Sequence, residues 1–127
     1  MLKNAANVFG VVLLLVGILG FVSGVTDENG MLLGLFHVNT LHNIVHIVTG
    51  VAALAAGMTS AAYAKTYFQV FGVVYALVTV LGFVYMDKDI LGVLANNMAD
   101  NILHIVIAVV ALYLGFASKD EMTGADV

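Results

Sequence analysis

The chain has 127 residues, of which 62% are hydrophobic and only 9% are charged, and its net charge is −4. A soluble globular domain is usually about one-quarter charged, so this composition excludes a water-soluble enzyme and a disordered chain. Only four residues are basic, so the chain has no basic patch for nucleic acid. Cysteine is absent, which removes disulfides, thiolate metal sites and thiol nucleophiles. The sequence therefore predicts an integral membrane protein.

Four apolar segments are long enough to cross the bilayer, which requires about 20 apolar residues for roughly 30 Å of hydrocarbon. The predicted spans cover residues 5–25, 40–58, 66–86 and 98–117. We therefore expect an all-α fold in which residues 1–127 form a single transmembrane four-helix bundle.

The two halves of the chain repeat each other. Residues 9–22 (FGVVLLLVGILGFV) and residues 71–84 (FGVVYALVTVLGFV) are identical at ten of fourteen positions, at an offset of 62. Residues 42–54 (HNIVHIVTGVAAL) match residues 100–112 (DNILHIVIAVVAL) at an offset of 58. This pattern predicts two transmembrane hairpins related by a pseudo-two-fold axis along the membrane normal. The repeated halves are residues 5–58 and 66–117.

The lysines predict the orientation of the chain. Lys3 precedes the first span, Lys65 lies in the connection between the second and third, and Lys119 follows the fourth. Because short cytoplasmic segments favour lysine, we expect both termini to be cytoplasmic. The opposite side carries acidic residues, namely Asp27, Glu28, Asp87 and Asp89, with Lys88 as a single countercharge. The apolar stretches 31–36 and 90–94 on that side are too short to span, and we expect short interfacial helices or re-entrant pieces there.

Each span carries small or polar residues at alternating spacings of three and four. Such residues let helices approach closely in a bilayer, where burial of leucine does little to join them. Tyr75 lies at mid-span within this pattern, so its hydroxyl is expected to bond another helix. The residues of this pattern form one line along each span, which we call its seam, and we expect the four seams to meet at the bundle axis. The seams, in chain order, are Gly10, Leu13, Gly17, Gly20 and Gly24; Asn43, His46, Gly50, Ala53 and Gly57; Gly72, Tyr75, Thr79, Gly82 and Met86; Asn101, His104, Ala108, Ala111 and Gly115.

The polar residues of the seams form the candidate site. His46 and His104 each follow an asparagine by one helical turn and lie seven residues past an equivalent asparagine at the helix start. This spacing places both imidazoles about 10 Å below the helix starts, at similar depth. Polar side chains inside a membrane are costly and are therefore functional candidates. The candidate cofactor-binding residues are His46, His104, Asn43 and Asn101.

Three interpretations of this cluster are open. The side chains could hydrogen-bond across the bundle, each bond contributing roughly 0.6–2 kcal/mol. They could hold a cofactor, with His46 and His104 as axial ligands of a haem, or with His42, His46 and His104 binding a metal ion beside an oxygen donor from Asp100. The third interpretation is proton or cation handling by imidazoles beneath an acidic mouth, which is formed by Asp27, Glu28, Asp87, Asp89 and Asp100.

Several short motifs carry a resemblance to a known family. They are NxxHxxxG at 43–50, NxxHxxxA at 101–108, FGVVY at 71–75 and LGF at 81–83. With these motifs the chain resembles a family of small bacterial four-helix membrane proteins known only as a domain of unknown function. The resemblance implies a prokaryotic cytoplasmic (inner) membrane and no particular activity. It marks as signature positions Asn43, His46, Asn101 and His104.

The sequence favours a non-enzymatic role. It shows no phosphate-binding glycine loop and no nucleophile–base pair. We expect a structural or accessory subunit that contacts other membrane proteins or forms a homo-oligomer. The GxxxG motif at Gly20 and Gly24 is a candidate docking seam. The alternatives are a haem- or metal-binding module centred on His46 and His104, and a proton- or cation-handling protein.

Overall fold

The computed structural model describes residues 1–118. Within this range the chain is all-α apart from one small β-hairpin, and its helices form a four-helix bundle, as the sequence predicted. All four helices are long and apolar enough to cross a membrane. The helices are α1 (Leu2–Leu19), α2 (Thr40–Thr59), α3 (Ala61–Tyr85) and α4 (Met98–Leu112), which the π-helix η1 (Tyr113–Ala117) continues.

Each of the last three helices begins at a capping residue whose side chain accepts a hydrogen bond from a backbone N–H. The Asn39 carboxamide accepts from His42 N at 2.9 Å and begins α2, and Asn97 accepts from Asp100 N at 2.9 Å and begins α4. Asp100 accepts in turn from Asn97 N at 3.0 Å, completing a capping box. Because Asn39 and Asn97 are equivalent in the repeat, they start α2 and α4 in the same register. His46 and His104 therefore lie equally far along their helices.

Two helix boundaries differ from the ends of the predicted spans. The first span ends at Leu19 and not at residue 25, because the backbone closes a tight turn there and the Thr26 hydroxyl donates to the Leu19 carbonyl at 2.9 Å. Helix α3 begins at Ala61, five residues before the predicted third span, because Ser60 accepts from the Tyr63 amide at 3.1 Å. Ser60 alone connects α2 to α3, so Lys65 lies within α3 and not in a loop.

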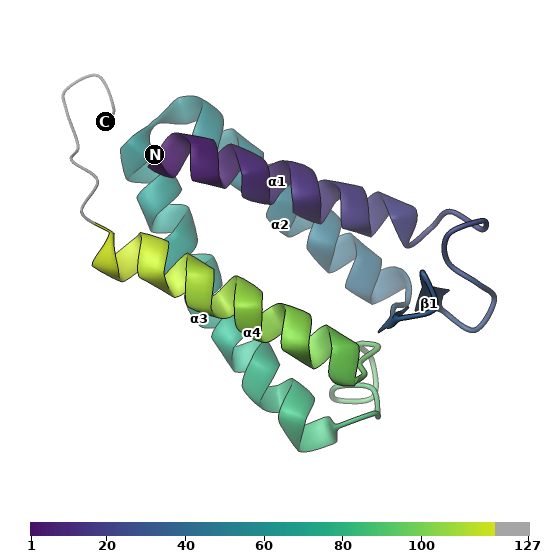
Figure 1. Cartoon of the computed structure of the whole chain (residues 1–127). Helices are drawn as coiled ribbons and strands as arrows, with labels where there is room; N and C mark the ends of the chain where they lie inside the picture. Colours follow the sequence, from purple (N-terminus) through teal and green to yellow (C-terminus); the bar gives the residue numbers. More distant parts are fainter. Residues whose placement is uncertain (119–127) are drawn as a thin grey trace.

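The helices pack as two hairpins (Figure 1). α1 lies along α2 and α3 along α4, whereas the hairpins meet mainly through α2 and α3. Figure 1 shows the start of α1 and the end of η1 at one end of the bundle and β1 at the other. Lys119 lies outside the described residues.

Burial follows the predicted seams with few exceptions. In α2 and α4 with η1, every seam residue is buried. In α1 the helical part of the seam is buried through Gly17, but Gly24 follows the helix and is exposed. The predicted GxxxG docking seam is therefore wrong, because its two glycines do not share a helix. Met86, after the end of α3, is also exposed.

An apolar core joins the hairpins near the Ser60 connection. Phe68 is fully buried there and meets Phe9 edge to face, with ring centroids 5.0 Å apart. Small side chains around them, such as Ala6, Ala53 and Ala64, are also buried. Because this core occupies the end of the bundle that holds Ser60, the polar residues of α2 and α4 gather in the other half.

The loops opposite Ser60 are turns, so the short interfacial helices that were one predicted alternative are wrong, and the re-entrant alternative stays a prediction. Strand β1 (Met31–Leu32) pairs antiparallel with β2 (Phe36–His37). The second loop closes similarly, through a bridge between Ile90 and Leu94. Both loops reverse through a leucine followed by a glycine with positive φ, which glycine adopts at little cost. These pairs are Leu33–Gly34 and Leu91–Gly92.

Candidate metal centre

Three histidines from the two hairpins meet inside the bundle. His42 and His46 lie one turn apart on α2, and His104 faces them from α4. Their exposed fractions are 1%, 2% and 3%. One nitrogen of each ring lies within 4.8 Å of the others, so the three rings offer a common set of donor atoms. The structure thus brings together the three residues that the sequence proposed as metal ligands.

Most of the ring nitrogens in this cluster have no hydrogen-bond partner among the described residues. They are Nε2 of His42, both nitrogens of His46 and Nδ1 of His104. An unpaired buried polar atom costs about 1–3 kcal/mol, so four such atoms in one place are a substantial destabilisation. Several buried ring nitrogens without a partner are the property expected of a site that binds a ligand.

The hydrogen bond of His42 fixes its tautomer. Its Nδ1 lies 3.0 Å from the Ala95 carbonyl oxygen. A carbonyl only accepts, so Nδ1 carries the proton and the lone pair of the neutral ring is on Nε2. Histidines that bind metals usually donate their second ring N–H to such an acceptor. His42 is therefore oriented as an Nε2 ligand.

The donor set favours particular metals. Three imidazoles suit zinc, copper or nickel, whereas magnesium and calcium require oxygen ligands. Around a tetrahedral ion with Zn–N bonds of about 2.0–2.1 Å, the nitrogens lie about 3.3 Å apart. The upper limit of 4.8 Å here is wider, so modest side-chain rotations would bring the three nitrogens to one ion.

A haem between His46 and His104 fits this arrangement poorly. Their ring centroids are 6.0 Å apart, but the His42 centroid lies only 4.6 Å and 5.6 Å from them. His42 therefore lies beside the space between the two rings, where a porphyrin held by both would have to extend. A single ion uses all three rings without this conflict.

Asp100 is buried but is not part of the histidine group found among residues 1–118. Its Oδ2 accepts from His37 N at 3.2 Å and from Asn97 N at 3.0 Å. The predicted oxygen ligand is therefore a carboxylate that connects the β-hairpin to the start of α4. No sequence pattern indicated the bond to His37, which is 63 residues away.

Asn43 and Asn101 lie at helix–helix contacts. A Cβ at Gly20 would collide with the Asn43 amide, and a Cβ at Gly82 would collide with the Asn101 amide. Asn101 also donates to the Gly82 carbonyl at 3.1 Å. These contacts indicate that the two asparagines hold each hairpin together beside the histidines. Their predicted role in cofactor binding stays a prediction.

The predicted helix-to-helix bond of Tyr75 is confirmed. Its hydroxyl lies 3.0 Å from the Thr49 hydroxyl, and its ring centroid lies 5.7 Å from that of His104. Tyr67 donates to the Thr49 carbonyl at 3.0 Å, so two residues of α3 contact one position of α2. Sequence analysis missed Thr49 and Tyr67. The available signal was the repeat, because Ile107 of the second half occupies the position of Thr49.

Besides Asp100, a second residue of the predicted acidic mouth has a local structural role. The exposed Asp27 accepts from the amides of Asn29 at 2.9 Å and Met31 at 3.0 Å and so shapes its own turn. Proton or cation handling stays a prediction without a specific contact in its favour.

Fold and site together define a small four-helix protein, apolar enough to span a membrane, with a buried cluster of three histidines. The family model described as "Domain of unknown function (DUF4383)" matches residues 3–117, and the chain belongs to that family. Neither a curated protein nor a solved structure matches the chain.

Proposed function

We propose that this protein is a membrane protein that binds one transition-metal ion of the zinc, copper or nickel type through His42, His46 and His104. The observation that carries the proposal is the set of buried, unpartnered ring nitrogens that face one another from two hairpins. Neutral imidazole is the commonest protein ligand for these ions.

Hydrogen bonding alone explains the cluster less well. A cluster kept only for packing would gain by pairing its nitrogens with carbonyls or hydroxyls, as His42 Nδ1 pairs with Ala95. Both nitrogens of His46 lack such a partner. A metal ion would satisfy one nitrogen on each ring at once.

The ion would connect the two hairpins. They meet mainly through α2 and α3, and α1 scarcely contacts α4. A metal held by α2 and α4 would therefore act as a link between halves, and binding would stabilise the folded bundle by mass action.

We propose further that the module is non-enzymatic. It would serve as an accessory subunit, in contact with other membrane proteins or with copies of itself. We also propose that it lies in a prokaryotic cytoplasmic membrane with both termini in the cytoplasm. The lysine distribution supports this topology, and Lys3 and Lys65 lie near the starts of α1 and α3.

The test is metal binding by the full chain in detergent, stripped with chelator and titrated with Zn²⁺. We expect about one ion per chain, no binding of Mg²⁺ or Ca²⁺, and loss of affinity of about tenfold or more in His104→Ala. His37→Ala is the matched control, because His37 lies in β2 outside the cluster, and it should bind as the wild type does. A folded wild-type protein that takes up no Zn²⁺, Cu²⁺ or Ni²⁺ would overturn the proposal.

A further inference from the structure

The metal centre begins just inside the loop end of the bundle, which is the end opposite Ser60. His42 is the third residue of α2, and Asp100 is the third residue of α4. The other end of the bundle is filled by the apolar core around Phe68. Because a hydrated ion does not cross an apolar core, the loop end offers the shorter route from water to the histidines.

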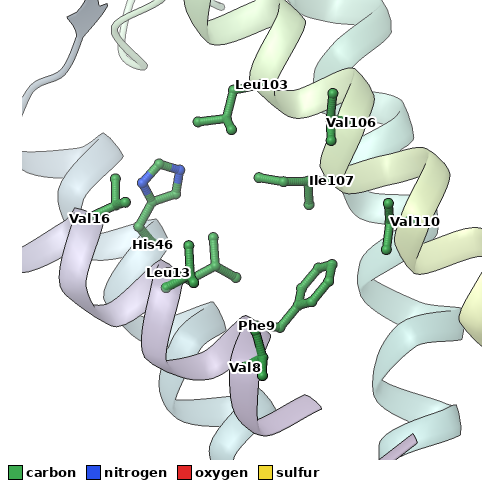
Figure 2. Close-up of a pocket in the computed structure, with 10 residues that line it drawn as sticks. Val8, Phe9, Leu13, Val16, His46, Leu103, Val106, Ile107 and Val110 are labelled. Atoms are coloured by element: carbon green, nitrogen blue, oxygen red, sulfur yellow. The ribbon is translucent and has the colours of Figure 1, made fainter. Parts of the chain in front are cut away.

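The sides of the bundle offer no better route. A cleft of about 210 Å³ between α1 and α4 reaches His46, but its walls are apolar side chains such as Val16, Leu103 and Ile107 (Figure 2). Exposed valines such as Val106 lie beside it, so in a membrane the cleft faces the acyl chains. A metal ion would lose its hydration along this path without gaining a ligand before His46.

The two loops close the remaining route. Their apolar side chains pack inward, and the exposed fractions of Leu32, Val38, Ile90 and Ala95 are all 4% or less. The three histidines beneath them are equally buried. A metal ion therefore reaches the histidines only when part of this cover opens.

Each loop is fastened to a helix of the other half. His42 Nδ1 donates to the Ala95 carbonyl at 3.0 Å, and the His37 N–H donates to Asp100 Oδ2 at 3.2 Å. Residues 37 and 95 are related by the repeat offset of 58, and so are residues 42 and 100. The two bonds are therefore equivalent in position, but the side chain donates in one and accepts in the other.

The two bonds differ in what their opening would cost the metal centre. The bond of His42 orients a proposed ligand, so the second loop has to stay in place while the ion binds. Asp100 is outside the histidine group, so its bond to His37 opens without moving a ligand. A second bond of the first loop, from Asn97 Nδ2 to the Leu35 carbonyl, is exposed and competes with water.

We propose that the β1–β2 hairpin, residues 31–37, is a gate over the metal centre, which the bond from His37 to Asp100 holds closed and through which the metal ion enters and leaves. This inference rests on the proposed metal centre. Local opening of a loop requires less free energy than separation of the packed helices, so the hairpin opens while the bundle stays folded.

A gate changes the rates of metal binding and leaves the affinity as it is. Weakening the bond between His37 and Asp100 raises the open fraction by the same factor with and without the ion. The association and dissociation rate constants therefore rise together, and Kd stays constant. Loss of a ligand, as in His104→Ala, raises Kd instead.

The experiment measures both rate constants by stopped flow, with Zn²⁺ binding to the chelator-stripped full chain in detergent and Zn²⁺ release to excess chelator. His37→Pro removes the N–H that Asp100 accepts, whereas His37→Ala keeps it and is the matched control. We expect both rate constants to rise about tenfold in His37→Pro at an unchanged Kd, because a hydrogen bond to a charged group is lost. Asp100→Ala should show the same rise, and His37→Ala should match the wild type.

Phe68→Leu separates opening of the gate from unfolding of the whole bundle. It weakens the apolar core at the far end and should leave the release rate of Zn²⁺ unchanged. Release as fast in Phe68→Leu as in His37→Pro would overturn the gate.

Two further results would overturn the gate and leave the metal centre in place. One is wild-type rates in both His37→Pro and Asp100→Ala, and the other is a higher Kd at an unchanged association rate. A wild-type chain that binds no Zn²⁺, Cu²⁺ or Ni²⁺ would overturn both proposals.

Discussion

Asn39 and Asn97 form equivalent hydrogen bonds between the two halves of the chain, because each side chain donates to a backbone carbonyl of the other half. Asn39 Nδ2 donates to the Val93 carbonyl at 2.9 Å, and Asn97 Nδ2 donates to the Leu35 carbonyl at 3.0 Å. Both the donors and the acceptors are related by the offset of 58. Each asparagine also begins the helix that carries a histidine of the cluster. The reciprocal pair therefore sets the relative position of α2 and α4 at the metal centre.

These bonds predict that each asparagine contributes to stability in two ways. Asn39→Ala removes a helix cap worth about 1 kcal/mol and an inter-loop hydrogen bond worth about 1 kcal/mol. We expect Asn39→Ala and Asn97→Ala each to lower the free energy of unfolding by about 2 kcal/mol, measured by detergent denaturation. Asn4→Ala, on an exposed position of α1, is the control and should change it by less than about 0.5 kcal/mol. Equal effects at Asn4 and Asn39 would contradict the assignment.

Gly82 predicts a steric test of the asparagine contacts. A methyl group at this position meets the Asn101 amide, and overpacking of a fitted contact costs about 1–3 kcal/mol. Gly82→Ala should therefore lower the unfolding temperature, as should Gly20→Ala at the equivalent contact with Asn43. Gly24→Ala is the control, because a Cβ there meets nothing within 4 Å. The assignment fails if Gly82→Ala is as stable as Gly24→Ala.

Tyr75 and Thr49 predict a measurable coupling between the hairpins. Their hydroxyls lie 3.0 Å apart in a buried contact between α3 and α2. In a double-mutant cycle with Tyr75→Phe and Thr49→Val, we expect a coupling free energy of about 0.6 kcal/mol, typical of bonds between membrane helices. Strict additivity of the two substitutions would show that the hydroxyls do not interact.

The helical pattern of the sequence was enough to predict the bundle and its buried faces. Glycine and alanine at alternating spacings mark close helix contacts, and these positions are buried in α2 and α4. The candidate ligands followed from the same periodicity. His42 and His46 are one turn apart, and the repeat offset carries His46 to His104, so three rings on two helices could be expected to meet.

The loops and helix ends could not be predicted in this way. Residues 20–25 are as apolar as the helix before them, and the turn that stops α1 depends on Thr26 reaching back to Leu19. Leu33 and Leu91 adopt positive φ, which leucine avoids by itself and which the hairpin pairing around each turn imposes. The bond from His37 to Asp100 joins residues of different halves, and no local pattern records it.

The proposed topology predicts which residues face the outside of the cell. The chain has no cysteine, so single cysteines can be introduced and labelled with a membrane-impermeant maleimide. Asn29→Cys, in the loop before β1, should react in intact cells, whereas Lys3→Cys should react only after permeabilisation. Labelling of Lys3→Cys in intact cells with protection of Asn29→Cys would show the opposite orientation.

The most direct test of the metal centre is X-ray absorption spectroscopy of the zinc-loaded full chain. We predict a coordination shell with three imidazole nitrogens at about 2.0 Å. The shell should lose one imidazole in His42→Ala and in His104→Ala and stay unchanged in His37→Ala. A wild-type spectrum with oxygen ligands only, or one that neither His42→Ala nor His104→Ala alters, would contradict a centre built from His42, His46 and His104.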